Sequence, residues 1–215
     1  MKIKVISLSS SNRRRESIRK QLDAQGAPFE FSDAITAEDA LHHIHHYDEH
    51  EFLLNCGRAA TATEIACYAS HLALWQHCGD GRDPYLILED DAELDASFMA
   101  GLLVVPSQIQ RRGLIRVSIP AVDDSLRIDD FGRFDIRYCR RAPLLALGYA
   151  VSPKAAARLA SGGKIVEEPL DKYLQRFWRH GQPVYAIYPP IVRHAPVAAE
   201  SDIGVRHRPD YGFST

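Results

Sequence analysis

Short apolar runs alternate along this chain with longer segments in which apolar residues recur every three or four positions. A short apolar run bounded by turn residues is typical of a buried strand, whereas the longer spacing is typical of an amphipathic helix. Strands are expected at 2–8, 29–34, 85–88, 115–119, 144–151 and 184–188. Helices are expected at 13–25, 61–78, 95–105, 153–161 and 169–179. This alternation predicts an α/β fold with a mixed sheet flanked by helices.

Proline and glycine mark several of the expected ends and turns. The helix at 95–105 should stop before Pro106, and Pro169 suits the first position of a helix. Polar residues 129–133 separate two short apolar runs, which predicts a hairpin. Gly148 stands inside an expected strand, where a glycine often marks the close approach of another group.

The helix at 61–78 has the clearest pattern. It opens with Thr61-Ala62-Thr63-Glu64, which matches a capping box, so Glu64 has a structural explanation from the sequence alone. His71 and Trp75 lie one turn apart and therefore share a face. From its position alone, His71 is as well explained by a buried, hydrogen-bonded histidine as by a ligand-binding one.

Three consecutive acids, Glu89, Asp90 and Asp91, follow directly after the apolar run 85–88. Ligands of open α/β sheets bind at the carboxyl ends of the strands. Adjacent carboxylates suit Mg²⁺ or Mn²⁺, and in an extended segment Glu89 and Asp91 face the same way. The pattern predicts a divalent-metal site that holds a phosphorylated ligand; the alternative is a solvated acidic turn.

The first expected strand also runs into a helix, through Ser9-Ser10-Ser11-Asn12. The free N–H groups at a helix N-terminus bind anions. Arg13, Arg14 and Arg15 add positive charge there, so one of them is a candidate phosphate ligand. The alternative for any single arginine is a solvated basic face.

Five of the ten histidines cluster within residues 42–50. Histidine pairs at helical spacing can bind a transition metal. Clustered histidines that lack ordered outer partners bind metals weakly, however. We therefore interpret the segment as a polar insertion that could contribute to acceptor binding.

Composition narrows the class of protein. With 215 residues the chain suits a single domain over 1–215, in which 189–215 would fold over the rest as a tail. A net charge of −2 argues against a nucleic-acid footprint. We expect a cytoplasmic protein, because apolar runs are too short for a bilayer span or a signal peptide. The cysteines lack CxxC spacing and are expected to be reduced thiols: Cys56, Cys67, Cys78 and Cys139.

Several motifs follow one another in a fixed order along the chain. They are Val-Ile-Ser-Leu at 5–8 with Arg14-Arg15, the strand 29–34, Glu-Ile-Ala-Cys…Ser-His…Leu-Trp within 64–75, Leu-Glu-Asp-Asp at 88–91, Gly-Tyr at 148–149, Pro-Leu-Asp at 169–171, Tyr-Pro-Pro at 188–190 and Ser-Asp-Ile at 201–203. With these motifs the chain resembles glycosyltransferase family 25 over nearly its whole length. That family includes bacterial lipooligosaccharide β-galactosyltransferases and collagen galactosyltransferase domains.

The resemblance implies a GT-A-type, Rossmann-like fold and an inverting transferase that uses a nucleotide sugar, most often UDP-galactose, with Mn²⁺ or Mg²⁺. The hexose acceptor would be a lipooligosaccharide or another, possibly lipid-linked surface glycan, with peripheral contact at the inner membrane face. Metal contact is assigned to Asp91, Glu89 and His194. The residues that would bind the nucleotide sugar are Ser7, Arg14, Arg15, Asp33, Glu64, His71, Glu89 and Asp90.

The resemblance assigns the catalytic base, which must deprotonate the acceptor hydroxyl, to Asp171. Judged by position alone, Asp171 could also be a first-turn acid that stabilises the helix dipole. Glu168 is the rival base.

The chain departs from the family pattern at two places in these motifs. Leu145-Ala146 replaces Gly-Thr before the Gly-Tyr strand, and Ala66 replaces a glycine. The basic C-terminal tail of many relatives is also missing. Leu145-Ala146 leaves open a non-catalytic nucleotide-sugar-binding domain of the same fold, whereas the missing tail weakens the case for membrane attachment. A metal-dependent phosphohydrolase fits less well, because an aspartyl nucleophile would be needed where Glu89 stands.

Overall fold

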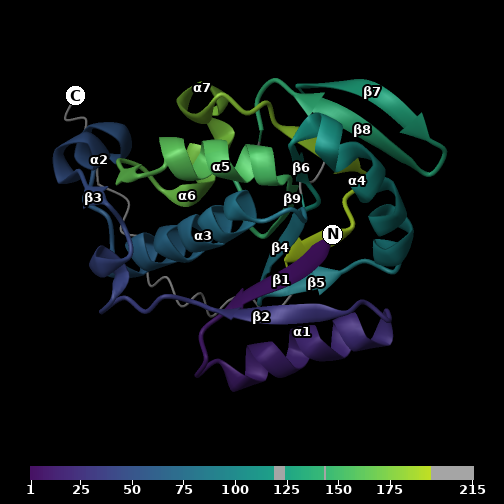
Figure 1. The fold of residues 1–215 in the computed structure, drawn as a ribbon, viewed down its shortest axis with the longest axis horizontal. Coiled ribbons are helices and arrows are strands. Elements are labelled where there is room, and N and C mark those ends of the chain that lie inside the picture. The colour runs from purple at the N-terminus through teal and green to yellow at the C-terminus, as the bar shows by residue number, and fades with distance from the viewer. Residues whose placement is uncertain (119–123, 143, 195–215) are drawn as a thin grey trace, which may run out of the picture.

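The computed structural model describes residues 1–118, 124–142 and 144–194. An eight-stranded sheet crosses the molecule in the order β2-β1-β4-β9-β6-β11-β8-β7 (Figure 1). Its strands are β1 (Lys2–Ser7), β2 (Phe29–Asp33), β4 (Tyr85–Glu89), β6 (Leu114–Arg116), β7 (Ser125–Phe131), β8 (Phe134–Cys139), β9 (Gly148–Val151) and β11 (Tyr185–Tyr188). The predicted mixed α/β architecture is confirmed.

Two further strand pairs lie outside the main sheet. They are β3 (His46–Tyr47) with β10 (Ile165–Val166), and β5 (Ala92–Leu94) with β12 (Val192–His194). The helices are α1 (Asn12–Ala24), α2 (Glu49–Cys56), α3 (Ala62–Asp80), α4 (Phe98–Arg112), α5 (Pro153–Gly162), α6 (Leu170–Gln175) and α7 (Phe177–His180), with a 3₁₀ turn at Ala40–His42.

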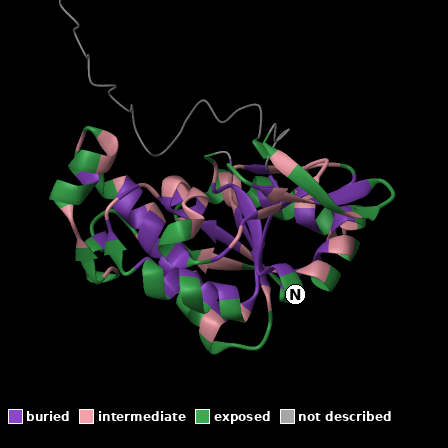
Figure 2. Ribbon diagram, turned by 90° about the horizontal axis from the view of Figure 1, so that it is seen from above, coloured by how far each residue is buried: buried purple, intermediate pink, exposed green. Residues whose placement is uncertain are grey.

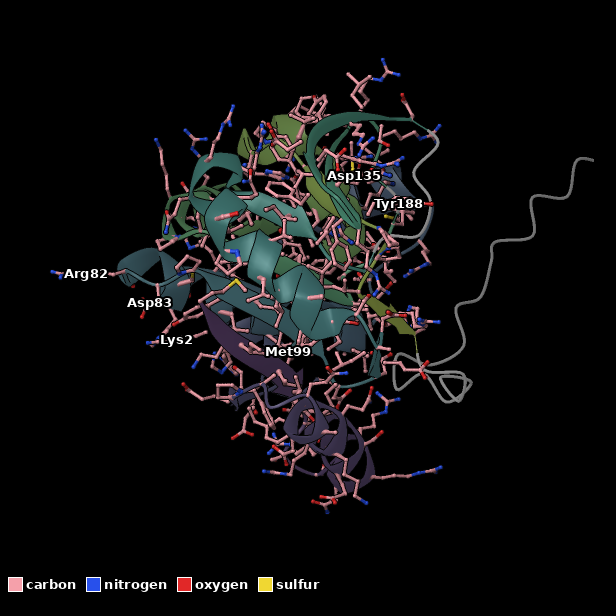
Figure 3. The ribbon with its side chains drawn as sticks, turned by 90° about the vertical axis from the view of Figure 1, so that its right-hand side faces the viewer. Lys2, Arg82, Asp83, Met99, Asp135 and Tyr188 are labelled. Atoms are coloured by element: carbon pink, nitrogen blue, oxygen red, sulfur yellow. The ribbon has the colours of Figure 1, made fainter. Side chains whose placement is uncertain are left out.

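Strands β2, β1 and β4 run parallel, and this places their carboxyl ends at one edge of the sheet. The register pairs Ile6 with Glu89 across β1 and β4, and Ser7 with Asp33 across β1 and β2. At the opposite edge, Lys2 Nζ and Asp83 Oδ2 form a salt bridge of 3.2 Å (Figure 3). The last residues of three strands therefore meet at a single place.

Each face of the sheet has its own core, because side chains alternate along a strand. Ile87 packs into the cluster formed with α3, α5 and α6, whereas Leu86 and Leu88 pack into the cluster formed with α1 and α4. Figure 2 shows the buried central strands between helices whose outer faces are exposed. Strand β4 is thus covered on both sides, and only its end reaches a cavity.

The capping box predicted at the start of α3 is confirmed, since Thr61 and Glu64 bond to each other's backbone N–H groups. The hairpin is also confirmed: β7 and β8 pair around Gly132, which has φ of +74°. Gly148 does mark a close approach. A Cβ there would lie 3.0 Å from Val117 Cγ2 and 3.1 Å from Leu88 Cδ2.

The prediction that a helix ends before Pro106 was wrong, because α4 begins at Phe98 and continues through the proline to Arg112. Proline removes one helical hydrogen bond. Buried Phe98, Val105 and Ile109 hold this helix against the sheet, and that packing outweighs the lost bond.

Other helices and strands also differ from their predicted bounds. The expected helix at 169–179 is divided into α6 and α7 at Arg176, whose φ and ψ of −84° and 70° are not helical. The expected strand 144–151 begins only at Gly148, and β6 ends at Arg116. Strand β5 and helix α2 were not predicted. The described part of the predicted tail at 189–215 includes β12, which pairs with β5. Residues 195–215, with the motif at 201–203, lie outside the described residues.

Candidate active site

A cavity of about 350 Å³ opens where β1, β2 and β4 end. Residues from four segments line it: Ile6, Ser7, Leu8, Ser10, Ser11 and Arg14; Ala34, Ile35, Thr36 and Ala37; Thr63, Ala66, Cys67, Ser70 and His71; and Glu89, Asp90 and Asp91. The three consecutive acids therefore lie together in a hollow at the carboxyl edge of the sheet, where ligands of α/β sheets bind.

Asp90 is held by residues from β1 and α1. Ser7 Oγ donates a 2.6 Å hydrogen bond to Asp90 Oδ2, and Arg14 Nη1 lies 3.4 Å from Oδ1. Arg15 Nη2 donates to the Ser7 carbonyl oxygen at 2.8 Å and also pairs with Asp33. Burial raises the pKa of Asp90, while the Ser7 hydrogen bond and the Arg14 charge offset part of that rise. Asp90 thus joins β4 to the first strand and helix.

Asp91 has an unsatisfied oxygen. Its Oδ1 is buried and has no hydrogen-bond partner among the residues that the structure describes. Its Oδ2 lies 3.8 Å from His194 Nδ1, which β12 brings there by pairing with β5. Burial, and then the charge of Glu89, raises the pKa of Asp91 to about 6. Burial and the Glu89 charge disfavour the ionised form of Asp91, and a bound cation would favour it. The residues present therefore fit a hard divalent ion.

Glu89 faces a different group of side chains. Its Oε1 lies 3.5 Å from Nε2 of His71, which is fully buried. Ligand atoms of Cys67, His71 and Glu89 all lie within 4.8 Å of one another. The structure therefore divides the three predicted metal ligands into two groups: Asp91 lies beside His194, and Glu89 lies beside His71.

The two candidate bases differ in what surrounds them. Asp171 lies in the first turn of α6, and its Oδ1 accepts a 2.8 Å hydrogen bond from the backbone N–H of Lys172. It does not line the cavity. Burial raises the pKa of the Cys67 thiol well above its usual range, and the charges of Glu89 and Asp171 add to that rise.

The rival, Glu168, is buried and paired with arginines. Its Oε2 lies 2.8 Å from Arg176 Nη1, and its Oε1 lies 3.9 Å from Arg179 Nε. Burial nevertheless raises its pKa. These ion pairs connect the segment before α6 with Arg176, at the junction of α6 and α7, and with Arg179 of α7, so Glu168 has a structural role.

The family model described as glycosyltransferase family 25 (LPS biosynthesis protein) matches residues 1–174. The chain belongs to glycosyltransferase family 25. The matched residues include the three acids and Asp171, whereas His194 lies beyond them. In the described residues, no helix is long and apolar enough to cross a membrane.

Individual relatives match a shorter stretch of the chain. The chain is 41% identical over 92 residues to the lipooligosaccharide biosynthesis protein lic2B of Haemophilus influenzae, covering 42% of the chain and 33% of that protein. It is 32% identical over 96 residues to the lacto-N-neotetraose biosynthesis glycosyltransferases LgtB and LgtE of Neisseria gonorrhoeae, covering 42% of the chain and 32% of each. These matches span about a third of the relatives' own lengths.

A solved structure described as a glucose-1-phosphate thymidylyltransferase from Bacillus anthracis aligns with this chain. The alignment covers 83% of this chain and 58% of the thymidylyltransferase chain. The identity is 11% and the TM-score 0.33, which is too low to support an inference about this family 25 chain.

Besides Asp171, four residues assigned from the family 25 resemblance lie off the cavity lining: Arg15, Asp33, Glu64 and His194. The Glu64 carboxylate accepts a 3.0 Å bond from the Thr61 N–H and pairs with both terminal nitrogens of Arg58, at 2.6 and 2.7 Å. Asp33 is exposed and pairs with Arg15. The capping interpretation accounts for the bonds of Glu64, while its binding role stays a prediction.

Sequence reasoning missed two side chains of the polar region beneath the cavity. Tyr149 was noted only as part of a motif, but its hydroxyl contacts His71. Arg116 is fully buried in β6, directly across from Tyr149, and its three guanidinium nitrogens lack hydrogen-bond partners within the described ranges. Burial lowers the pKa of Arg116 to about 10. A charged residue inside an apolar strand was the available signal.

Proposed function

We propose that this chain is an inverting, metal-dependent glycosyltransferase of the GT-A type that transfers galactose from UDP-galactose to a lipooligosaccharide or another surface glycan. The observation that carries the proposal is the cavity at the ends of β1, β2 and β4, in which three acids face the start of a helix. Family membership supports transfer of a sugar, and the names of the relatives support a glycan acceptor.

Asp91 and His194 are the residues that would hold Mn²⁺ or Mg²⁺, with Glu89 close by. When bound, the ion supplies positive charge that stabilises the departing diphosphate. Asp91 suits this role because its Oδ1 is buried and unsatisfied in the described structure. Asp90 is occupied by Ser7 and Arg14, so its role is to hold the acidic segment in place.

The start of α1 supplies the second half of the diphosphate site. Ser10 and Ser11 line the cavity just before this 13-residue helix, and the Ser11 side chain does not cap it. Free N–H groups at a helix N-terminus favour phosphate oxygens. Arg14 lines the same cavity and adds a cation.

Asp171 is the proposed base, which accepts the proton of the attacking acceptor hydroxyl. In an inverting reaction the nucleophile attacks from the side opposite the leaving diphosphate. The base should therefore come from another part of the fold than the acids that face that diphosphate, and α6 meets this requirement. Its charge acts on Cys67 at the cavity wall.

The direct test is UDP release from a panel of UDP-sugars, with Mn²⁺ or with EDTA, in the presence of lipooligosaccharide acceptors. Release that needs the metal and is abolished in Asp91→Ala supports the transferase. Asp23→Asn, an exposed acid of α1, is the matched control. Binding of UDP-sugar without turnover on any acceptor would instead support the non-catalytic domain. If the wild-type chain binds no nucleotide sugar at all, both the transferase and the non-catalytic binding domain are contradicted.

We also propose that the chain acts in the cytoplasm and contacts the inner membrane face where the acceptor is lipid-linked. Cell fractionation with and without the acceptor pathway tests this. A protein found only outside the cytoplasmic and inner-membrane fractions would contradict it.

A further inference from the structure

A chain of hydrogen bonds runs from the core of the protein to the cavity wall. Trp75 Nε1 donates to Tyr149 Oη at 2.8 Å, and the same oxygen lies 2.7 Å from His71 Nδ1. The His71 and Tyr149 rings are stacked, with an interplanar angle of 21°. All three side chains are completely buried. On the far side of the imidazole, Nε2 lies 3.5 Å from Glu89 Oε1.

The bonding capacity of these groups determines where the protons lie. An indole N–H can only donate, so Tyr149 Oη accepts from Trp75. The tyrosine then has one O–H to give, and His71 Nδ1 is its acceptor in the described part of the chain. Burial raises the pKa of Tyr149 well above its usual range, so the phenol keeps its proton.

This arrangement selects one tautomer of His71. If Nδ1 accepts, the proton of the neutral imidazole is on Nε2. The opposite tautomer would leave the buried tyrosine O–H unsatisfied, which is unfavourable. Nε2 has no hydrogen-bond partner of normal length among the described residues. Among the described residues, the carboxylate that can accept from this N–H is that of Glu89, whose Oε1 lies 3.5 Å away.

We propose that Trp75, Tyr149 and His71 form a relay that presents the Nε2–H of His71 to Glu89, which makes His71 a positioning residue for that carboxylate. The distance of 3.5 Å is longer than a normal hydrogen bond, and the Glu89 side chain is partly exposed at the cavity. Hydrogen bonds in ligand-free sites are often long and tighten when the ligand binds. The effect on turnover rests on the proposed transferase function, whereas the tautomer does not.

The same atoms suggest a rival arrangement. Cys67, His71 and Glu89 could hold Zn²⁺, because their ligand atoms lie within 4.8 Å of one another. Zinc would need the lone pair of Nε2, and the relay places a proton there. Zinc would also need a thiolate, and burial disfavours ionisation of Cys67 by raising the pKa of its thiol. The two arrangements are mutually exclusive at Nε2, so one experiment separates them.

Nitrogen-15 NMR of the full chain reads the tautomer directly, with the His71 signals assigned by their loss in His71→Gln. The relay predicts a protonated Nε2 and an unprotonated Nδ1 in the wild type. Tyr149→Phe should weaken this preference, because it removes the donor to Nδ1 and leaves Glu89 as the group that favours a proton on Nε2. Tyr173→Phe is the matched control, since it removes another buried hydroxyl, bonded to the Leu159 carbonyl oxygen, and should leave His71 unchanged. A proton on Nδ1 in the wild type, or stoichiometric Zn²⁺ binding lost in His71→Leu, overturns the relay.

Two substitutions test the effect on Glu89. The Gln side chain of His71→Gln can keep an N–H near the position of Nε2, whereas His71→Leu cannot. We expect kcat/KM for the UDP-sugar to fall about tenfold in His71→Leu and in Tyr149→Phe, with partial recovery in His71→Gln. Unchanged kcat/KM in His71→Leu overturns the positioning role. If the wild type shows no transfer at all, the transferase proposal fails, while the NMR result still decides the relay.

Discussion

His194 Nδ1 lies 3.8 Å from Asp91 Oδ2, although the two residues are far apart in the sequence. Strand β12 pairs antiparallel with β5, and that register places His194 opposite Ala92, next to the acid. A short accessory strand pair thus completes a two-residue group at the cavity. This geometry makes Asp91 the acid best placed for a cation.

Asp91→Asn should lose metal-dependent turnover by at least ~100-fold, because the amide keeps the shape but removes the charge that holds the ion. Activity measured across a Mn²⁺ titration checks this. His194→Ala should have a smaller effect, about tenfold, and should mainly raise the Mn²⁺ concentration needed. An Asp91→Asn variant with wild-type metal dependence would exclude Asp91 as a ligand.

Asp171→Asn should bind UDP-sugar with near wild-type affinity and yet fail to transfer, because the variant lacks only the proton acceptor. Calorimetry for binding and a transfer assay for turnover separate the two effects. Glu168→Gln is the matched comparison.

Glu168→Gln should retain transfer and lower the free energy of unfolding by about 2 kcal/mol, because it removes the buried charge that faces Arg176 and Arg179. Both arginines keep a second partner, Asn55 for Arg176 and Glu167 for Arg179. Normal transfer by Asp171→Asn together with inactive, stable Glu168→Gln would reverse the assignment of the base.

His180 should make stability depend on pH. Burial lowers its pKa from 6.5 to about 4, so the folded chain keeps it neutral. Between these two values the unfolded state binds a proton that the folded state does not, and stability therefore falls as the pH drops from about 6.5 toward 4. The maximum loss is about 3 kcal/mol.

Urea unfolding across this pH range measures the effect. His180→Asn is the diagnostic variant, because its amide oxygen can replace Nδ1 as the acceptor of the Gln182 N–H but does not titrate. Its stability curve should be flatter below pH 6.5. Parallel curves for the two proteins would show that His180 is not responsible.

Arg116→Met should stabilise the protein by about 1–4 kcal/mol, because it replaces a buried cation that has no hydrogen-bond partner in the described residues with an apolar side chain of similar length. Chemical denaturation checks this. Arg112→Met is the control and should destabilise, since Arg112 pairs with Asp129. A stabilised but inactive Arg116→Met would show that the guanidinium is retained for function at the expense of stability. A destabilised variant would contradict the prediction.

Local patterns in the sequence were enough to predict the elements that build the site. The apolar run before Glu89 predicted a buried strand with acids at its end, and the Thr61–Glu64 spacing predicted the capping box. Both patterns lie within a few residues of the chain, so the local sequence alone records them. The order of the motifs along the chain likewise indicated the family, because that order is a property of the sequence itself.

Only the tertiary structure decided what each acid contacts. Asp90 is held by Ser7, Asp91 lies beside His194, and Glu89 lies beside His71. Three adjacent residues with similar side chains thus have three different surroundings, because strand register and helix packing bring distant parts of the chain to each one. Packing also carried α4 through Pro106 and joined Trp75, Tyr149 and His71 in one network. Such contacts form only when the sheet and its helices assemble, so no local pattern records them.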